Sequence, residues 1–284
     1  MFWQTSRFRI DLSRPLIMGI VNVTPDSFSD GGRHVDARAA LLHCERLLKE
    51  GAHILDIGGE STRPGSPPVS LEQELARVLP VLRGAVTLGV PLSIDTYKPE
   101  VMRLALDLGV DILNDIWALR QDGAEDLVVQ HPSCGVCLMH MHREPQTMHT
   151  TPMQGDVVPQ VRDFLEGVTR KLRARGVAPD RIVLDAGIGF GKTVEQNFAL
   201  LARQDELREL AYPWLAGWSR KSSLGSVTGV ELAAERVVPS VAAALLAVEH
   251  GVAIVRVHDV KETVQALQVW NAMRAQKNKD INEQ

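Results

Sequence analysis

Polar and charged side chains recur at the ends of short apolar runs throughout this 284-residue chain. They are Asn22, Asp56, Asp95, Asn114, His140, Asp185, Ser219, Arg220, Lys221, Arg256 and His258. Carboxylates accept hydrogen bonds, amides both donate and accept them, and Lys and Arg donate to anions. Gathered in one pocket, these groups could bind a polar ligand and hold an anionic group beside it.

The apolar runs that precede these side chains have the length of buried strands and are rich in β-branched and aliphatic residues. The eight runs lie at residues 16–21, 53–57, 91–94, 112–114, 136–139, 181–184, 213–217 and 253–257. Longer stretches between them, such as 37–50, 71–86 and 157–175, repeat apolar residues every three or four positions and predict helices. The alternation predicts a parallel sheet with helical crossovers.

Eight such units predict an α/β protein with the fold of a (β/α)8 TIM barrel, in a single domain that spans residues 1–275. In that fold the carboxyl ends of all strands face one side, so we expect the active site there. One or two of the polar residues could be ordinary strand-end caps, but the whole set is hard to explain in that way. An open doubly wound sheet is the alternative architecture. The polar segment 276–284 predicts a frayed tail.

The composition is typical of a soluble globular protein, with 45% hydrophobic and 23% charged residues, a net charge of -4 and a pI near 6.1. Such a chain has no general attraction for nucleic acid or anionic membranes, so we expect small-molecule partners. Residues 237–248 contain Pro239 and are too few to cross a bilayer, which predicts a buried helix. The first 15 residues lack the pattern of a signal peptide, and three cysteines are too few for a disulfide framework. Both observations favour the cytoplasm.

Two segments rich in Gly, Pro, Ser and Asp predict turn-forming loops above the barrel mouth, namely NVTPDSFSDGG at 22–32 and GGESTRPGS at 58–66. Six further motifs follow them, namely IDTYKP at 94–99, LNDI at 113–116, CLMHM at 137–141, LDAGIGFGK at 184–192, SRKS at 219–222 and IVRVHD at 254–259. Together they resemble the full motif series of the dihydropteroate synthases, in the family's order, from about residue 16 to about residue 263. The resemblance implies an enzyme that joins a pterin diphosphate to p-aminobenzoate and releases pyrophosphate.

The resemblance implies a pterin site deep in the barrel. Its residues would be Asp95, Asn114, Ile116, Met139, Asp185 and Lys221. A carboxylate can accept two parallel N–H donors from the aminopyrimidine edge of the ring, an amide can donate and accept, and an ammonium can donate to a ring carbonyl or nitrogen. Asp185 and Lys221 alone could instead form a structural salt bridge.

The leaving group is implied to lie near a second set of residues, with Mg²⁺ as the expected cofactor. The diphosphate residues would be Asn22, Thr62, Arg63, Arg256 and His258. A guanidinium can hold phosphate oxygens with two hydrogen bonds. Mg²⁺ usually keeps phosphate oxygens and waters as ligands, so Asn22 is the one protein metal ligand that we expect.

The p-aminobenzoate site is implied to form from both loops and the later strands. Its residues would be Phe28, Thr62, Pro64, Phe190, Ser219 and Lys221. Apolar walls suit the ring, and hydroxyl groups or a helix amino terminus suit the carboxylate. Because sulfonamides mimic this substrate, we expect them to compete for the site.

The resemblance further suggests that the pterin–diphosphate bond ionises first and that the neutral aromatic amine then attacks. The residues expected to support catalysis are Asp95, Asp185, Lys221, Asp30 and Arg63. Carboxylates would stabilise the cation on the ring, and Mg²⁺ with the basic residues would take up the charge of the leaving group. A homodimer is also implied, and helix 237–248 is a candidate for its interface.

Other interpretations of the sequence remain open. AGIGFGKT at 186–193 fits a relaxed phosphate-loop pattern and could indicate a nucleotide-binding enzyme, and a pterin-binding barrel without activity is a second alternative. Cys134 and Cys137 form a C-x-x-C pair that could be redox-active. The chain departs from the usual family residues at Tyr97, Ala186, Ile188 and Trp218, which puts the shape of the pocket and its affinity for sulfonamides in doubt.

Overall fold

The computed structural model describes residues 1–24, 33–61, 67–144, 147–148 and 150–282, without the side chains of 33–36 and 277–282. Eight parallel strands close into a barrel in the order β10-β3-β4-β5-β6-β7-β8-β9. They are β3 (Leu16–Asn22), β4 (Ile54–Gly58), β5 (Leu92–Asp95), β6 (Ile112–Asp115), β7 (Gly135–Met139), β8 (Ile182–Asp185), β9 (Trp214–Ala216) and β10 (Ile254–Val257). The closed order confirms the TIM barrel, and the open sheet is wrong.

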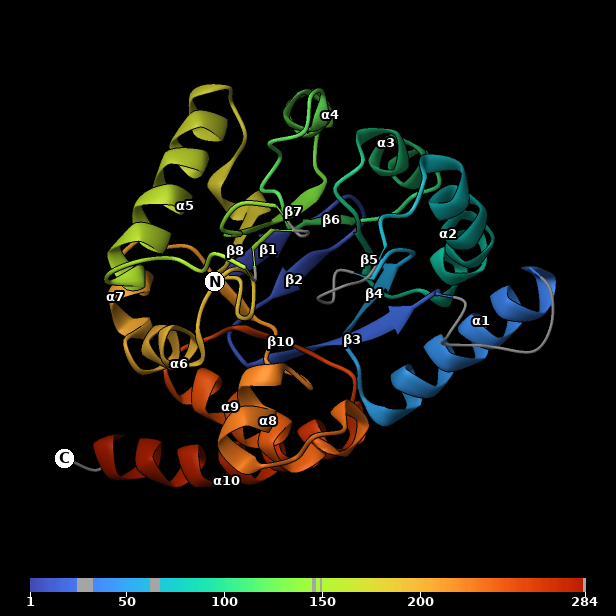
Figure 1. The fold of residues 1–284 in the computed structure, drawn as a ribbon. Helices are drawn as coiled ribbons and strands as arrows, with labels where there is room; N and C mark the ends of the chain where they lie inside the picture. Colours follow the sequence, from blue (N-terminus) through green and yellow to red (C-terminus); the bar gives the residue numbers. More distant parts are fainter. Residues whose placement is uncertain (25–32, 62–66, 145–146, 149, 283–284) are drawn as a thin grey trace.

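Helices surround the barrel on its outside (Figure 1). They are α1 (Arg33–Glu50), α2 (Leu71–Ala85), α3 (Pro99–Asp107), α4 (Ala124–Gln130), α5 (Val157–Ala174), α6 (Val194–Ala202), α7 (Gln204–Arg208), α8 (Ser222–Thr228), α9 (Val237–Glu249) and α10 (Val260–Asn282). Short 3₁₀ turns lie at η2 (Val86–Leu88), η3 (Pro179–Arg181) and η4 (Ala233–Glu235). The eight predicted strands match the observed ones to within one residue at either end.

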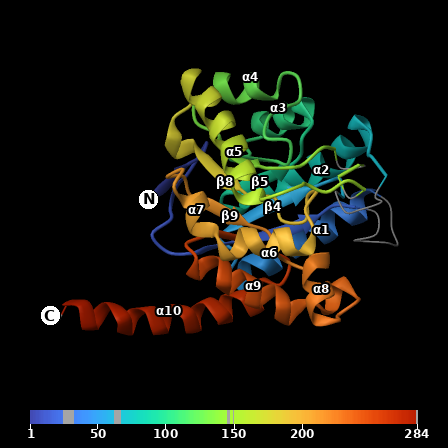
Figure 2. The same cartoon turned by 60° about the vertical axis from the view of Figure 1, so that its left-hand side comes forward.

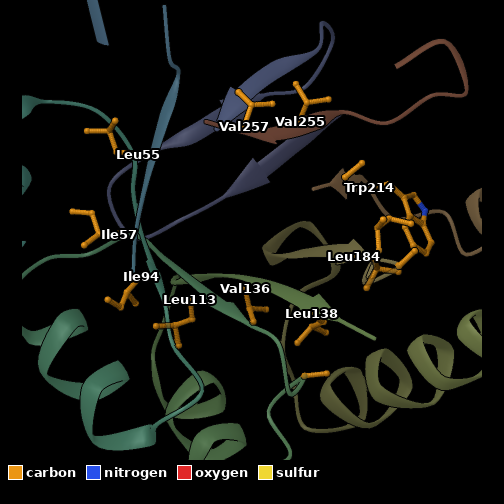
Figure 3. Close-up of a cluster of buried hydrophobic side chains, with 14 of the residues drawn as sticks. Leu55, Ile57, Ile94, Leu113, Val136, Leu138, Leu184, Trp214, Val255 and Val257 are labelled. Atoms are coloured by element: carbon orange, nitrogen blue, oxygen red, sulfur yellow. The ribbon is translucent and has the colours of Figure 1, made fainter. Parts of the chain in front are cut away.

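Side chains alternate between the two faces of each strand, as the pleat of a β-strand requires. The residues that point outward pack against the helices in the largest core cluster, and Figure 3 labels ten of its members, from Leu55 to Val257. The residues that point inward near the amino ends of the strands form a second cluster that includes Met18, Val183 and Ile254. Apolar side chains therefore fill the interior of the barrel near the amino ends of the strands. The polar side chains that point inward lie near the carboxyl ends.

An amino-terminal hairpin, which the sequence analysis did not predict, precedes the barrel. Strands β1 (Phe2–Gln4) and β2 (Arg9–Asp11) pair antiparallel. Trp3 is fully buried in the inner cluster, and its indole N–H donates to the backbone oxygen of Arg181 at 3.0 Å. The hairpin thus covers the end of the barrel that lies away from the polar residues.

Helix α9 matches the apolar stretch that we expected to be buried, but only one face of it is covered. Ala243, Ala247 and Val248 are buried, whereas Val238 is 78% exposed. Helix α10 continues through Asn282, beyond residue 276, and its far end projects past the barrel (Figure 2). A search of the described residues finds no helix with the length and apolar character that crossing a membrane requires.

Candidate active site

The polar residues of the strand ends meet inside the barrel. The side chains of Asp56 and Asn114 come from β4 and β6, which are separated in the barrel by β5, yet they are joined by a hydrogen bond of 3.1 Å. Arg256 of β10 reaches Asp56 and also Asp95 of β5. Side chains from strands that are not neighbours can contact one another only across the interior, so these four residues form one polar cluster inside the barrel at the carboxyl ends.

Arg256 bridges the two carboxylates of this cluster. Its Nε donates to Asp56 Oδ2 at 2.5 Å and its Nη2 to Asp95 Oδ2 at 2.7 Å. Burial raises the pKa of Asp95 to about 7, with the positive charge of Arg256 opposing the shift and the negative charge of Asp56 adding to it. The sequence resemblance placed Arg256 with the diphosphate, whereas the structure brings it to the pterin residues. Its contact with the diphosphate stays a prediction.

Asp185 ends β8 and is held by the turn that follows. Its Oδ1 accepts the backbone N–H of Gly187 at 2.7 Å. Gly187 has φ +70°, and a Cβ there would lie 1.9 Å from the backbone oxygen of His140, so glycine is required. Burial raises the pKa of Asp185, while this N–H and then the charges of Lys221, Lys192 and Arg256 lower it. Asp185 thus faces three cations, Lys221, Lys192 and Arg256.

Lys192 decides against the phosphate-loop interpretation. Its buried Nζ donates to the backbone oxygens of Gly187 at 2.9 Å and Phe190 at 3.2 Å, and it contacts His140 Nδ1 at 3.0 Å. Burial lowers the pKa of Lys192 to about 7, and burial beside this lysine lowers the pKa of His140 to about 2. The lysine of a phosphate loop binds the phosphates of a nucleotide, whereas Lys192 donates to backbone oxygens of its own loop. The structure therefore does not support the nucleotide-binding alternative.

An apolar wall lies next to the polar pocket. Ile116, Met139 and Phe190 are buried in one cluster with Met141 and Met148. The Nζ of Lys221 lies 4.3 Å from the centroid of the Phe190 ring. The structure thus brings together three predicted pterin residues, Ile116, Met139 and Lys221, and two predicted p-aminobenzoate residues, Phe190 and again Lys221.

The loop between β9 and α8 carries Ser219 and Lys221, and hydrogen bonds to neighbouring elements hold it in place. Ser219 Oγ lies 2.9 Å from His258 Nδ1 and accepts the His258 backbone N–H at 3.1 Å. Arg220 has φ +61°, and its guanidinium donates to both oxygens of Asp259 at 2.5 and 3.1 Å. Ser240 Oγ accepts the backbone N–H of Arg220 at 2.8 Å.

Three residues of the site had no assigned role in the sequence analysis. The sequence showed Asp56 as one of the polar residues at the strand ends, with nothing to distinguish it from the others. Lys192 belonged to a motif that suggested another function. Asn197, which accepts from the Gly189 N–H at 2.8 Å and donates to Ser223 Oγ at 2.9 Å, gave no signal because an asparagine within an expected helix is ordinary.

Five predicted site residues lie outside the described residues. They are Phe28, Asp30, Thr62, Arg63 and Pro64. The described start of their second loop is anchored, because the Glu60 carboxylate accepts from Lys98 Nζ and from the Tyr97 hydroxyl at 3.1 Å. Tyr97, one of the departures from the family, thus binds the described start of the loop at Glu60. Trp218, another departure, packs in the core against Phe198 with ring centroids 5.2 Å apart.

The described residues offer no preformed metal cage, since no group of three or more His, Cys, Asp or Glu side chains among them could hold an ion. Asn22 is half-buried at the end of β3 and pairs in register with Gly58 of β4. A single amide oxygen there fits a Mg²⁺ ion that keeps phosphate oxygens and waters as its other ligands.

Cys134 and Cys137 are free and buried, and burial raises the pKa of both thiols, which argues against a redox pair.

Comparison with known proteins agrees with this geometry. Residues 18–258 match the family model of the pterin binding enzymes. The dihydropteroate synthase of Neisseria meningitidis serogroup B is 52% identical over 95% of this chain and 97% of its own length. The Burkholderia cenocepacia enzyme complexed with 7,8-dihydropteroate is 51% identical, with a TM-score of 0.88 and 98% of both chains covered. The Yersinia pestis enzyme in a sulfonamide drug complex is 43% identical, with a TM-score of 0.90, covering 97% of this chain and 100% of that one. The chain therefore belongs to the pterin binding enzymes and, within them, to the dihydropteroate synthase family.

Proposed function

We propose that this enzyme joins a 7,8-dihydropterin-6-ylmethyl diphosphate to p-aminobenzoate and forms 7,8-dihydropteroate and pyrophosphate. The observation that carries the proposal is the polar pocket of Asp95, Asn114, Asp185 and Arg256 beside an apolar wall. The Burkholderia cenocepacia relative has been solved with 7,8-dihydropteroate, the product of this reaction. A flat ring with a donor-rich edge matches both halves of such a pocket.

The pterin ring is read by Asp95, Asn114, Asp185 and Lys221, with Ile116 and Met139 against its face. A site built to hydrogen-bond these ring groups rejects analogues that lack them, because its buried polar atoms would be left unpaired. This arrangement accounts for the number of polar side chains at one end of the barrel.

The carbon–oxygen bond to the diphosphate ionises and leaves a cation delocalised over the pterin ring. Asp95 and Asp185 stabilise this cation through space. The p-aminobenzoate nitrogen then attacks the methylene carbon with its lone pair and loses a proton afterwards. Because an aromatic amine is neutral at working pH, orientation and exclusion of water contribute more than a strong base.

The diphosphate leaves toward Asn22, Arg256 and His258, with Thr62 and Arg63 completing its shell. Asn22 would supply one oxygen to a Mg²⁺ ion, which when bound would neutralise negative charge on the leaving group. Asp30 and Arg63 support the same step from the two loops.

p-Aminobenzoate binds between Phe190 and the two loops, with Phe28 and Pro64 as apolar neighbours and Ser219, Lys221 and Thr62 as polar ones. Sulfonamides compete at this site, as the Yersinia pestis complex suggests. The short distance from Lys221 Nζ to the Phe190 ring supports a shared role for these two residues.

The enzyme works as a homodimer in the cytoplasm. Val238 and Leu246 of α9 and Val269 of α10 are exposed apolar residues on helices that pack together, and such a patch favours association with a second copy. Sedimentation velocity of Leu246→Glu should show a monomer where the unchanged chain shows a dimer. Three buried free thiols fit a reducing compartment.

The reaction is tested by measuring pyrophosphate release with the pterin diphosphate, p-aminobenzoate and Mg²⁺, each omitted in turn. Release that requires both substrates and accompanies dihydropteroate formation supports the proposal. Pterin binding without release would instead identify a barrel that binds but does not catalyse. Addition of a sulfonamide at saturating concentration should displace p-aminobenzoate, and undiminished binding would contradict the proposed site.

A further inference from the structure

Asp56 is the one carboxylate of the pocket for which neither the motifs nor the proposed reaction supplies a task. It lies on β4, is fully buried, and accepts hydrogen bonds at Oδ2 from Asn114 Nδ2 at 3.1 Å and from Arg256 Nε at 2.5 Å. Its Oδ1 is also buried and has no hydrogen-bond partner within the part of the chain that the structure describes. Burying an ionisable group this completely is costly, so a use for it in the pocket is expected.

A carboxylate accepts hydrogen bonds and donates none, which fixes the orientation of both its neighbours. Asn114 must turn its NH₂ group toward Asp56, so its carbonyl oxygen is left for another donor. Arg256 must turn Nε toward Asp56, which directs Nη2 to Asp95 at 2.7 Å. The second oxygen of Asp95 then remains an acceptor, as does Asp185 Oδ2, because Asp185 uses Oδ1 for the Gly187 N–H.

We propose that Asp56 is a positioning residue that turns Asn114 and Arg256 so that the pocket presents acceptors to the N–H groups of a pterin ring. The inference rests on the proposed function and deepens it, since it names the origin of selectivity for the amino-substituted edge of the ring. A purely structural role would predict lower stability in Asp56 variants without a change in selectivity. The two roles are therefore separable by measuring binding and unfolding on the same proteins.

The first test compares Asp56→Asn with the unchanged enzyme, using pterin and the same ring without its 2-amino group as probes. The NH₂ group of an amide at position 56 can donate as well, so Asn114 is no longer forced to turn its own NH₂ group toward that position and is free to flip. We expect the preference for pterin, measured as the ratio of dissociation constants, to fall by about tenfold or more. We also expect the KM for the pterin substrate to rise by about as much, with the KM for p-aminobenzoate nearly unchanged.

Asp111→Asn is the matched control. Asp111 is equally buried, is paired to Arg7 at 2.7 Å and accepts the Leu92 backbone N–H at 2.9 Å, but it precedes β6 at the far end from the pocket. The control should lower the free energy of unfolding and keep the preference for pterin. An equal loss of preference in both variants would overturn the proposal.

A reciprocal exchange provides a rescue. In Asp56→Asn combined with Asn114→Asp, the new amide can donate to the new carboxylate and accept from Arg256 Nε, while an acceptor still faces the ring. The double variant should recover most of the preference that Asp56→Asn loses. No recovery, or an unaltered preference in Asp56→Asn, overturns the positioning role. If the unchanged enzyme neither binds pterin nor turns over, the proposed function fails instead, so the two failures are distinct.

Discussion

At the scale of single residues, burial and the charge of Arg256 shift the pKa of Asp95 in opposite directions. Burial raises its pKa from an ordinary value of 3.8 to about 7, and Arg256 at 2.7 Å limits the rise. Because the folded form binds this proton more tightly than the unfolded chain, the stability it contributes at low pH is lost as the pH rises through about 7. Near neutral pH the residue can therefore change charge, and only its ionised form can stabilise a cation.

We expect kcat/KM for the pterin substrate to rise with pH through an inflection near 7, as Asp95 ionises in the free enzyme. Asp95→Asn should abolish that inflection and reduce turnover by about 100-fold, since one electrostatic group of this kind typically contributes that much. Steady-state rates from pH 5 to 9 measure both effects. A variant that keeps more than about a tenth of the rate would rule out cation stabilisation by Asp95.

The size of the Asp95 shift depends on its partner. Arg256 lowers the pKa of Asp95, so Arg256→Gln should move the inflection to higher pH. The same rate profile measures this shift. An inflection that stays in place would assign it to another group.

At the scale of elements, the loop between β8 and α6 is fixed from within by Lys192. Its ammonium joins the backbone oxygens of Gly187 and Phe190, and Asn197 holds the Gly189 N–H at 2.8 Å. These contacts within the protein hold the loop that carries Phe190 and follows Asp185, and no bound ligand is needed for them.

Lys192→Met should lower the free energy of unfolding by about 2–4 kcal/mol, because it removes one buried donor that the backbone oxygens of His140, Gly187 and Phe190 share. Urea unfolding measures the loss, and turnover should fall as well because Asp185 shifts with the loop. Lys261→Met is the control, since Lys261 is exposed on α10 and should cost little. Equal effects of the two substitutions would show that Lys192 does not brace the loop.

The loop between β9 and α8 is fixed from outside, by the ion pair of Arg220 with Asp259. The pair is part-buried, with 27% and 10% of the side chains exposed. Arg220→Ala and Asp259→Ala should each lower stability, and a double-mutant cycle should give a coupling energy of about 1–2 kcal/mol. Both should also raise the KM for p-aminobenzoate through Ser219 and Lys221. Additive effects in the cycle would mean that the pair does not hold the loop.

At the scale of the whole molecule, the two ends of the barrel are separate in function. The hairpin buries Trp3 beneath the inner cluster, on the side opposite to Asp95 and Asn114. Residues at the covered end contribute to stability, and those at the open end to chemistry, as is general for this architecture.

Trp3→Ala should therefore reduce stability and leave catalysis unchanged. Removing a fully buried tryptophan costs about 3–5 kcal/mol through lost contacts and the cavity that remains. Urea unfolding measures this loss, and kcat/KM should equal that of the unchanged enzyme at a temperature well below unfolding. A large fall in kcat/KM under those conditions would contradict the separation of the two ends.

Much of the architecture follows from the sequence, because strand runs and amphipathic helices are local patterns. The eight strands, the closed barrel and the motif order could all be predicted, and with them the positions of Asp95, Asn114 and Asp185 at one end. The hairpin around Trp3 could not be predicted, since its two strands have three residues each and owe their stability to the barrel that they cover.

The sequence by itself determined which residues reach the carboxyl ends of the strands, because each strand is a local apolar run that a polar residue ends or follows. It did not determine which of them pair. Asp56 and Arg256 are 200 positions apart and lie on strands that are not adjacent, so their contact exists only once the barrel has closed. In the folded protein Lys192 is also buried against its own loop, where it donates to the backbone oxygens of Gly187 and Phe190 and does not act as a phosphate-loop lysine. Pairing across an interior depends on distances that no local pattern contains, and the tertiary structure alone decided it.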